Sequence, residues 1–286
     1  MSEQQPVQVT YLDDLIAKIA WVRDTQSDAI AEAGRVCADA IAGDGLVFTF
    51  GTGHGGFAAL ESFPRTGGVT GFRPIVESSI ALMHHVLGDQ GTAQYRFLHT
   101  REGYGRAILR SHQIKDGDAL ILFSHSGINA VILDMAVEFQ ERGLKVVAVT
   151  SVPHSSQVAS RHSCGKRLYE IADVVIDTGI PLEDASQHID GLEYPVGPTS
   201  TSVAVAMTHA INAATAADLV ARGVQPMIMV NTNSNRTTEA HQQNDRNYAE
   251  LWRRLRSREF SAPPVTAATT VPGAAPGAAP AAPEAR

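Results

Sequence analysis

Residues 119–129 read ALILFSHSGIN, and residues 142–151 read RGLKVVAVTS. The apolar block that opens the first stretch has no polar alternation, which is typical of a strand covered on both faces in a parallel sheet. Apolar residues then recur at helical spacing over 128–139, and Gly143 stands where a left-handed helix cap belongs. A second apolar block, residues 146–149, follows. Together these stretches predict one strand–helix–strand crossover.

Ser124, Ser126 and Gly127 lie at the corner where the first of these strands meets the helix. Backbone N–H groups at the start of a helix lack helical partners, and the helix dipole favours negative charge there. The two hydroxyls add donors, and Gly127 lets a ligand approach the backbone. The corner therefore predicts a phosphate site. The alternative is an ordinary serine cap, which is worth about 1 kcal/mol to a helix.

The composition excludes several classes of protein. The chain has 286 residues, of which 44% are hydrophobic and 19% charged, as is usual for a soluble globular protein. A net charge of −7 without a basic stripe argues against nucleic-acid binding. Two cysteines without a C-x-x-C pair, and an N-terminus without an export signal, predict a cytoplasmic protein. No apolar run approaches the roughly 20 residues of a membrane span, so no membrane contact is expected.

Expected strands alternate with expected helices along the chain. We expect strands at 46–50, 74–78, 119–123, 146–149, 172–177 and 226–230, and helices at 11–42 (long or broken), 57–63, 80–87, 128–139, 203–221 and 248–255, with another helix ending near 107–112 and a turn at 88–91. Residues 178–198 are expected to form a long irregular loop. We expect a flexible segment at 1–10, one domain at 11–260, and a disordered Ala/Pro-rich tail at 261–286. The alternation predicts a doubly wound three-layer α/β/α fold.

Polar corners follow three of the expected strands. Residues 51–54 read GTGH after the strand at 46–50, and Thr150 and Ser151 follow the strand at 146–149. In doubly wound folds, ligands bind beyond the carboxyl ends of the strands. We therefore expect these corners and the one at Ser124 to line a single crevice.

These corners together resemble the sugar isomerase (SIS) family. The chain is most similar to a bacterial group of SIS proteins that are loosely described as phosphoheptose isomerase-like, over roughly residues 10–255. That likeness includes Glu61 before an Arg-x-Gly-Gly element at 65–68, and the segments 160–170, 173–177 and 197–201. The resemblance implies a flavodoxin-like sandwich with a five-stranded parallel sheet, a sugar phosphate ligand and a homodimer.

The resemblance also implies a set of ligand-binding residues. Those expected to hold the phosphate or the sugar are Gly51, Thr52, Gly53, Ser124, Ser126, Gly127, Asn129, Thr150, Ser151 and Lys166. Two departures from the family stand out. Many SIS loops have Ser where this chain has Gly55, and related chains often have paired acids where Leu60 precedes Glu61.

Aldose–ketose isomerisation moves a proton between adjacent carbons through an enediol, so it needs a base and an acid. Glu61 is the candidate base. His162 and then His54 are the candidate acids, and Lys166 is placed to polarise the carbonyl or to neutralise phosphate. For Glu61 the alternative is a structural ion pair with Arg65, four residues later. For the two histidines it is a loop or capping role. No cofactor is expected, and no histidine pair has the helical spacing of a metal site.

Two other functions fit the same phosphate site. One is a non-catalytic phosphosugar sensor, which without a DNA-binding segment needs a separate partner protein. The other is an etherase-type lyase that removes an α-proton from a phosphorylated amino sugar.

Overall fold

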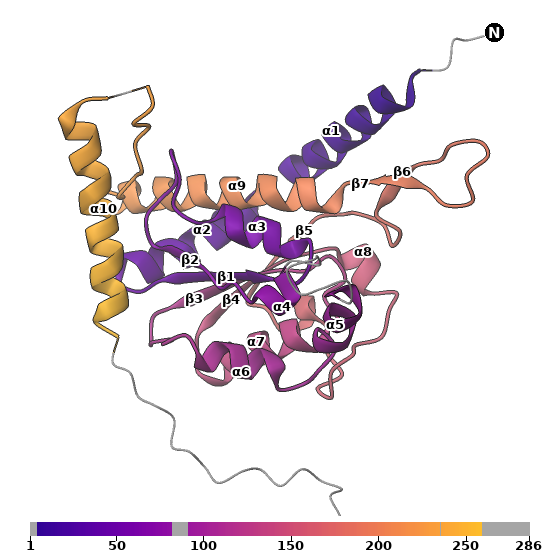
Figure 1. Ribbon diagram of the computed structural model, residues 1–286, viewed down its shortest axis with the longest axis horizontal. Coiled ribbons are helices and arrows are strands. Elements are labelled where there is room, and N and C mark those ends of the chain that lie inside the picture. Colours follow the sequence, from indigo (N-terminus) through magenta and orange to yellow (C-terminus); the bar gives the residue numbers. More distant parts are fainter. Residues whose placement is uncertain (1–4, 82–90, 235, 259–286) are drawn as a thin grey trace, which may run out of the picture.

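Five parallel strands form the centre of the molecule, in the order β2-β1-β3-β4-β5 (Figure 1). The computed structural model describes residues 5–81, 91–234 and 236–258. The strands are β1 Val47–Gly51, β2 Phe72–Pro74, β3 Ala119–Phe123, β4 Lys145–Thr150 and β5 Val174–Asp177. The four long strands expected from the apolar blocks are thus confirmed, while the expected strand at 74–78 is shorter and begins earlier. The predicted five-stranded parallel α/β fold is confirmed.

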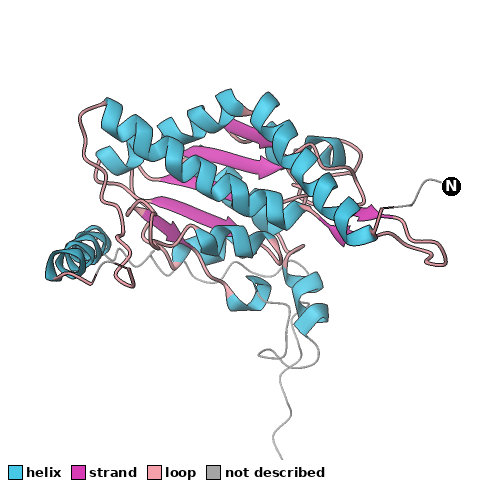
Figure 2. Cartoon of the chain, turned by 90° about the horizontal axis from the view of Figure 1, so that it is seen from above, coloured by secondary structure: helices cyan, strands magenta, loops and turns pink. Residues whose placement is uncertain are grey.

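Helices cover both faces of the sheet, as Figure 2 shows. They are α1 Val7–Thr25, α2 Ser27–Ala42, α3 Gly55–Glu61, α4 Ser78–Ala81, α5 Gly91–Leu98, α6 Tyr104–Arg110, α7 Ala130–Glu141, α8 Val152–Ser155, α9 Ser200–Ala221 and α10 Thr238–Arg256, with a 3-10 turn at Leu168–Glu170. A strand that is covered on both sides is apolar at most positions, which explains the apolar blocks in the sequence.

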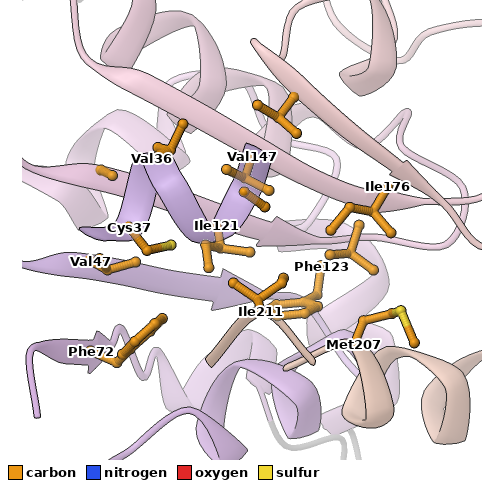
Figure 3. Packing of buried hydrophobic residues seen from close by; sticks show 14 of the residues in the cluster. Val36, Cys37, Val47, Phe72, Ile121, Phe123, Val147, Ile176, Met207 and Ile211 are labelled. Carbon is orange, nitrogen blue, oxygen red and sulfur yellow. The ribbon is translucent and has the colours of Figure 1, made fainter. Parts of the chain in front are cut away.

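The side chains of β3 alternate between two buried clusters. Ile121 and Phe123 point to one face, where they pack against residues of α2 and α9 such as Cys37 and Ile211 (Figure 3). Leu120 and Leu122 point to the opposite face and pack against α6, α7 and α10. The sheet is therefore the middle layer of three.

The helix expected at 11–42 is broken. α1 begins at Val7, inside the segment expected to be flexible, and ends before Gln26. The side-chain oxygen of Gln26 accepts a hydrogen bond from the amide of Asp177 at 3.1 Å. This bond ties the break between α1 and α2 to the end of β5.

Two further expectations, for residues 178–198 and 226–230, are corrected by the structure, and others fall on residues that it does not describe. The expected irregular loop at 178–198 contains an antiparallel hairpin, β6 Ala185–Gln187 with β7 Val196–Pro198. The strand expected at 226–230 is reduced to one bridge, between Ile228 and Val69. Most of the helix expected at 80–87, nearly all of the turn at 88–91, and the tail at 261–286 lie outside the described residues.

α9 is the helix in the described part of the chain that is long and apolar enough to span a membrane, by length and composition alone. No run of this length was expected from the sequence. One stripe of α9, which includes Val203, Met207 and Ile211, is buried against the sheet and α2. The approach to α2 is so close that a Cβ on Gly34 would lie 2.5 Å from the Cβ of Ala214. This stripe has the packing of a core helix.

Candidate functional site

A cavity of about 310 Å³ lies where β1, β3, β4 and β5 end. The residues around it that matter here are Thr52, His54, Ser124, His125, Ser126 and Asn129, joined by Tyr95, Thr150, Thr178, Asp184 and Ser200. The strand order reverses between β1 and β3, because β2 lies on one side of β1 and the later strands lie on the other. Doubly wound sheets bind their ligands at such a reversal. The cavity thus occupies the position in the fold where a ligand is expected.

The corner after β3 is a tight turn. The Oγ of Ser124 accepts a hydrogen bond from the amide of Gly127 at 3.1 Å. Gly127 has a φ of 62°, and a Cβ there would lie 2.9 Å from the Oγ1 of Thr150. Only glycine fits both the conformation and the space. Gly127 lies behind the turn and shapes it, while Ser124 and Ser126 line the cavity.

Four backbone amides at this corner have no acceptor within the described part of the chain. Those of Ser126, Ile128, Asn129 and Ala130 donate to no group in the described residues. They precede or begin α7, a helix of 12 residues. Its dipole adds positive potential at the same place, so the corner suits an anion.

A cation also lies beside this helix end. Nη1 of Arg161 donates to the Oδ1 of Asn129, with 3.0 Å between the two atoms. Arg161 comes from the same segment, 160–170, as the predicted ligand-binding residue Lys166. Lys166 is exposed and does not line the cavity.

The corner after β1 supplies Thr52 and His54 to the cavity wall. Here the backbone passes very close to β3. A Cβ on Gly55 would lie 2.5 Å from the carbonyl oxygen of Phe123. The serine found at this position in many SIS loops therefore does not fit this chain, and its hydroxyl is not available here.

The strand β4 contributes through Thr150. Thr150 is fully buried and lines the cavity, and its hydroxyl donates to the carbonyl of His125 at 3.4 Å. The hydroxyl of Ser151 points elsewhere: it donates to the carbonyl of Ile180 and accepts from the amide of His154 at 3.1 Å. Ser151 is thus the cap of α8 and does not line the cavity.

Comparison with known proteins identifies the family. A family model described as the SIS domain matches residues 10–151. A UPF0309 protein of Streptomyces coelicolor is 34% identical over 229 residues, which cover 80% of this chain and 89% of that protein. A UPF0309 protein of Oceanobacillus iheyensis is 38% identical over 207 residues, 71% of this chain and 82% of that protein.

The chain belongs to the SIS-domain family, in its UPF0309 group. The predicted family membership is therefore confirmed. Among solved structures, phosphoheptose isomerase GmhA from Neisseria gonorrhoeae aligns with a TM-score of 0.48 and 13% identity. That alignment covers 73% of this chain and 96% of the other.

In this SIS protein the candidate base Glu61 is engaged outside the cavity. Its carboxylate pairs with Arg65 and accepts from the Nε2 of His209 at 3.0 Å. Burial alone would raise the pKa of Glu61, but the pairing with Arg65 and His209 outweighs it and the pKa is lowered. This is the structural ion pair that the sequence left open as the alternative.

The candidate acid His162 is also engaged away from the cavity. Its Nδ1 accepts from the amide of Cys164 at 3.0 Å, so its Nε2 carries the proton that faces the buried Asp134, 3.2 Å away. Asp134 in turn accepts from the amide of Gly105 at 3.0 Å. His162 thus ties the 160–168 segment to α7. Of the three candidate catalytic residues, His54 alone lines the cavity.

Besides Tyr95, the SIS cavity contains two ionisable residues that were not selected from the sequence. His125 lies between the two chosen serines, and its ring meets that of His154 edge-on, with centroids 4.6 Å apart. Asp184 comes from the expected loop, and its carboxylate accepts from the amides of Thr199 and Ser200 at 2.9 and 2.8 Å. His125 was within reach of sequence reasoning, because it stands inside the motif. Asp184 was not, since no local pattern marks it.

Proposed function

We propose that the cavity binds a sugar phosphate and that the protein is a sugar-phosphate aldose–ketose isomerase. The observation that carries the proposal is the turn after β3. There the amides of Ser126, Ile128, Asn129 and Ala130 have no partner among the described residues and lie beside the dipole of α7. Arg161 adds a cation there. A volume of about 310 Å³ suits a ligand the size of a pentose or hexose phosphate.

The wall of the cavity divides into two parts. The phosphate is proposed to bind at the β3 corner, against Ser124, Ser126 and the free amides. The sugar then extends along the β1 corner, toward Thr52 and His54, and toward the start of α9 at Ser200. These hydroxyls and ring nitrogens are suited to hydrogen bonds with sugar hydroxyls.

The sensor is the second candidate, and the placement of Glu61 and His162 favours it. Because both are engaged outside the cavity, binding does not by itself imply turnover. The lyase reading uses the same phosphate site and differs in releasing a lactyl group. The products of the reaction distinguish the three.

The homodimer is also a proposal, and the arm formed by α1 and the β6–β7 hairpin supports it. Figure 1 shows the two lying side by side and projecting from the sheet. The hydroxyl of Tyr11 donates to the carbonyl of Pro198 at 3.0 Å and so joins the helix to the hairpin. Ile16 is 64% exposed and Tyr194 is 72% exposed on this arm. A second copy of the chain would cover these apolar side chains. The expected cytoplasmic location, and the absence of nucleic-acid and membrane partners, rest on composition and stay proposals.

The binding proposal is tested by thermal unfolding with a panel of pentose 5-phosphates, hexose 6-phosphates and heptose 7-phosphates. At 100 times the dissociation constant a ligand stabilises the native state by about 2.7 kcal/mol, which shifts the midpoint by several degrees. Ser126→Ala should weaken binding about tenfold, whereas Ser156→Ala, on an exposed position beyond the site, should not. No shift with any compound would contradict the phosphate site.

The reaction is tested by turnover in deuterated water. Deuterium at C1 or C2 of the sugar supports the isomerase, and release of lactate supports the lyase. Binding without either outcome supports the sensor.

A further inference from the structure

The imidazole of His125 lies at the wall of this cavity with both of its ring nitrogens buried. Neither ring nitrogen makes a hydrogen bond with standard geometry to the described residues, and both are shielded from solvent. Buried polar side-chain atoms are nearly always hydrogen-bonded, because leaving one unpaired costs free energy. A group kept in this state at the wall of a cavity points to a function that involves a ligand.

The surroundings keep this ring neutral. Burial is the largest influence, and it lowers the pKa of His125. The edge of His154 faces the ring, and like-charge repulsion from it acts in the same direction. Asp184 and the nearby carbonyl of Pro181 oppose the shift only in part. A neutral imidazole is a proton acceptor, so His125 is able to act as a base at neutral pH.

Asp184 is placed to stabilise the ring once it has taken a proton. Its carboxylate attracts the imidazolium, and burial, the largest influence on its own pKa, is outweighed by hydrogen bonds that keep it ionised. The donors are the hydroxyl of Ser200 at 2.6 Å and the amides of Thr199 and Ser200. Asp184 holds a left-handed backbone with a φ of 57°, which is costly for a residue that is not glycine. The start of α9 thus fixes a negative charge near His125.

We propose that His125 is the base that moves the proton between C1 and C2 of the bound sugar, with Asp184 as its positioning residue. This inference rests on the proposed function, since it names the catalytic group of the same site. The ring borders the cavity beside the phosphate corner. In the proposed step it turns about its Cβ–Cγ bond, leaves the carbonyl of Pro181 and presents a nitrogen to the ligand.

The proton balance of the step is complete within the sugar and the ring. His125 takes the proton from C2 of the open aldose, and the electron pair of the C–H bond becomes the C1=C2 double bond while the aldehyde oxygen gains a negative charge. The imidazolium returns the proton to C1. The hydroxyl proton of O2 passes to O1, and the C2 carbonyl of the ketose is formed. Amides and hydroxyls at the cavity wall stabilise the charged oxygen.

His125→Asn provides the test, because asparagine keeps a polar side chain but is no base. The measurements are the dissociation constant of the best sugar phosphate of the panel and its rate of deuterium uptake from solvent. We expect uptake to fall about 100- to 10,000-fold while the dissociation constant changes less than about threefold. His112→Asn is the matched control, since His112 is also a partly buried histidine with a lowered pKa but packs against Phe48 and does not line the cavity. It should retain uptake.

Asp184→Asn tests the positioning role separately. It should lower the pKa of the His125 ring, followed by NMR, and should slow uptake without abolishing ligand binding. An unchanged ring pKa would overturn this part of the proposal.

The outcomes distinguish a wrong assignment of His125 from a wrong proposed function. If His125→Asn retains uptake within fivefold of the wild type, the inference is overturned and the proposed function stands. If the wild type binds a sugar phosphate without uptake from any compound of the panel, the inference is overturned and the sensor is supported. If no compound binds, the proposed function fails and the inference fails with it.

Discussion

Each end of β3 is followed or preceded by an ionisable side chain whose polar atoms are buried, and the two differ in their hydrogen bonding. At the amino end, Asp118 accepts hydrogen bonds from the amides of Leu46 and Lys115 at 2.8 and 2.7 Å. It also accepts two from Arg258, at 2.6 and 2.8 Å. At the carboxyl end, His125 has no hydrogen-bond partner of standard geometry in the described residues. The side chain at the amino end of β3 has hydrogen bonds to both of its oxygens, whereas the ring nitrogens at the carboxyl end have none of standard geometry in the described residues.

This difference separates a structural role from a functional one. A buried charge with every lone pair satisfied fixes the fold, because its removal leaves its partner unpaired. A buried polar group with nothing to bind costs stability, and a fold retains such a group where a ligand completes it. The contrast predicts that changes at the amino end affect stability, while changes at the carboxyl end affect binding and turnover.

Arg258→Met should give the largest loss of stability. It leaves the carboxylate of Asp118 buried without its charge partner, which costs about 3–5 kcal/mol. Denaturant unfolding measures the change, and Arg256→Met, on an exposed position of α10, is the control. Ligand affinity of the folded fraction should be unchanged. A loss below about 1 kcal/mol in the free energy of unfolding would contradict a structural role for the buried pair of Asp118 and Arg258.

Gly127→Ala should have the next largest effect and should alter both properties. The new Cβ meets Thr150 and Ser155 at 2.9 and 3.1 Å in a left-handed conformation. We expect a cost of about 2–3 kcal/mol, together with weaker ligand binding. Gly143→Ala separates strain from crowding, since Gly143 has a φ of 70° but open space around it, so its cost should be about 1 kcal/mol. An equal loss of stability in Gly127→Ala and Gly143→Ala would contradict the close packing of Gly127 in its turn.

The pH dependence of stability should reflect the lowered pKa of His125, at the carboxyl end of β3. Burial lowers the pKa of His125, so the unfolded chain binds more protons than the native state as pH falls from about 7 to 5. Stability is therefore lost as pH falls through that window. His125→Asn should reduce this loss without removing it, because burial also lowers the pKa of His99, His112 and His154. An unchanged slope, measured by denaturant unfolding at pH 7 and pH 5, would argue against burial of the ring.

Glu61→Gln should have the smallest effect. Its carboxylate is part of a half-exposed ion pair with Arg65 and His209, and such pairs contribute about 1 kcal/mol or less. Glu61 does not line the cavity, so ligand affinity should also be preserved. Loss of turnover at unchanged affinity would restore Glu61 as the base and contradict the assignment of His125.

The sequence predicts what depends on neighbours in the chain. The apolar blocks give the strands, and glycine and serine after each block give the corners, because burial on two faces and tight turns leave local patterns. Partners that are distant in sequence leave none. Glu61 meets His209, 148 residues later, and Asp184 meets the start of α9 through a hairpin that has no periodic signal. Ser151 matched the motif, yet its hydroxyl is used by Ile180 and α8, which a pattern cannot reveal.

A crystal structure of the protein with a bound sugar phosphate from the panel tests the proposed phosphate site at the β3 corner most directly. We predict that the phosphate oxygens lie within hydrogen-bond distance of the amides between Ser126 and Ala130, with the sugar in the cavity beside His125. A phosphate bound elsewhere, or a β3 corner that stays unoccupied while the compound binds in solution, would contradict the account.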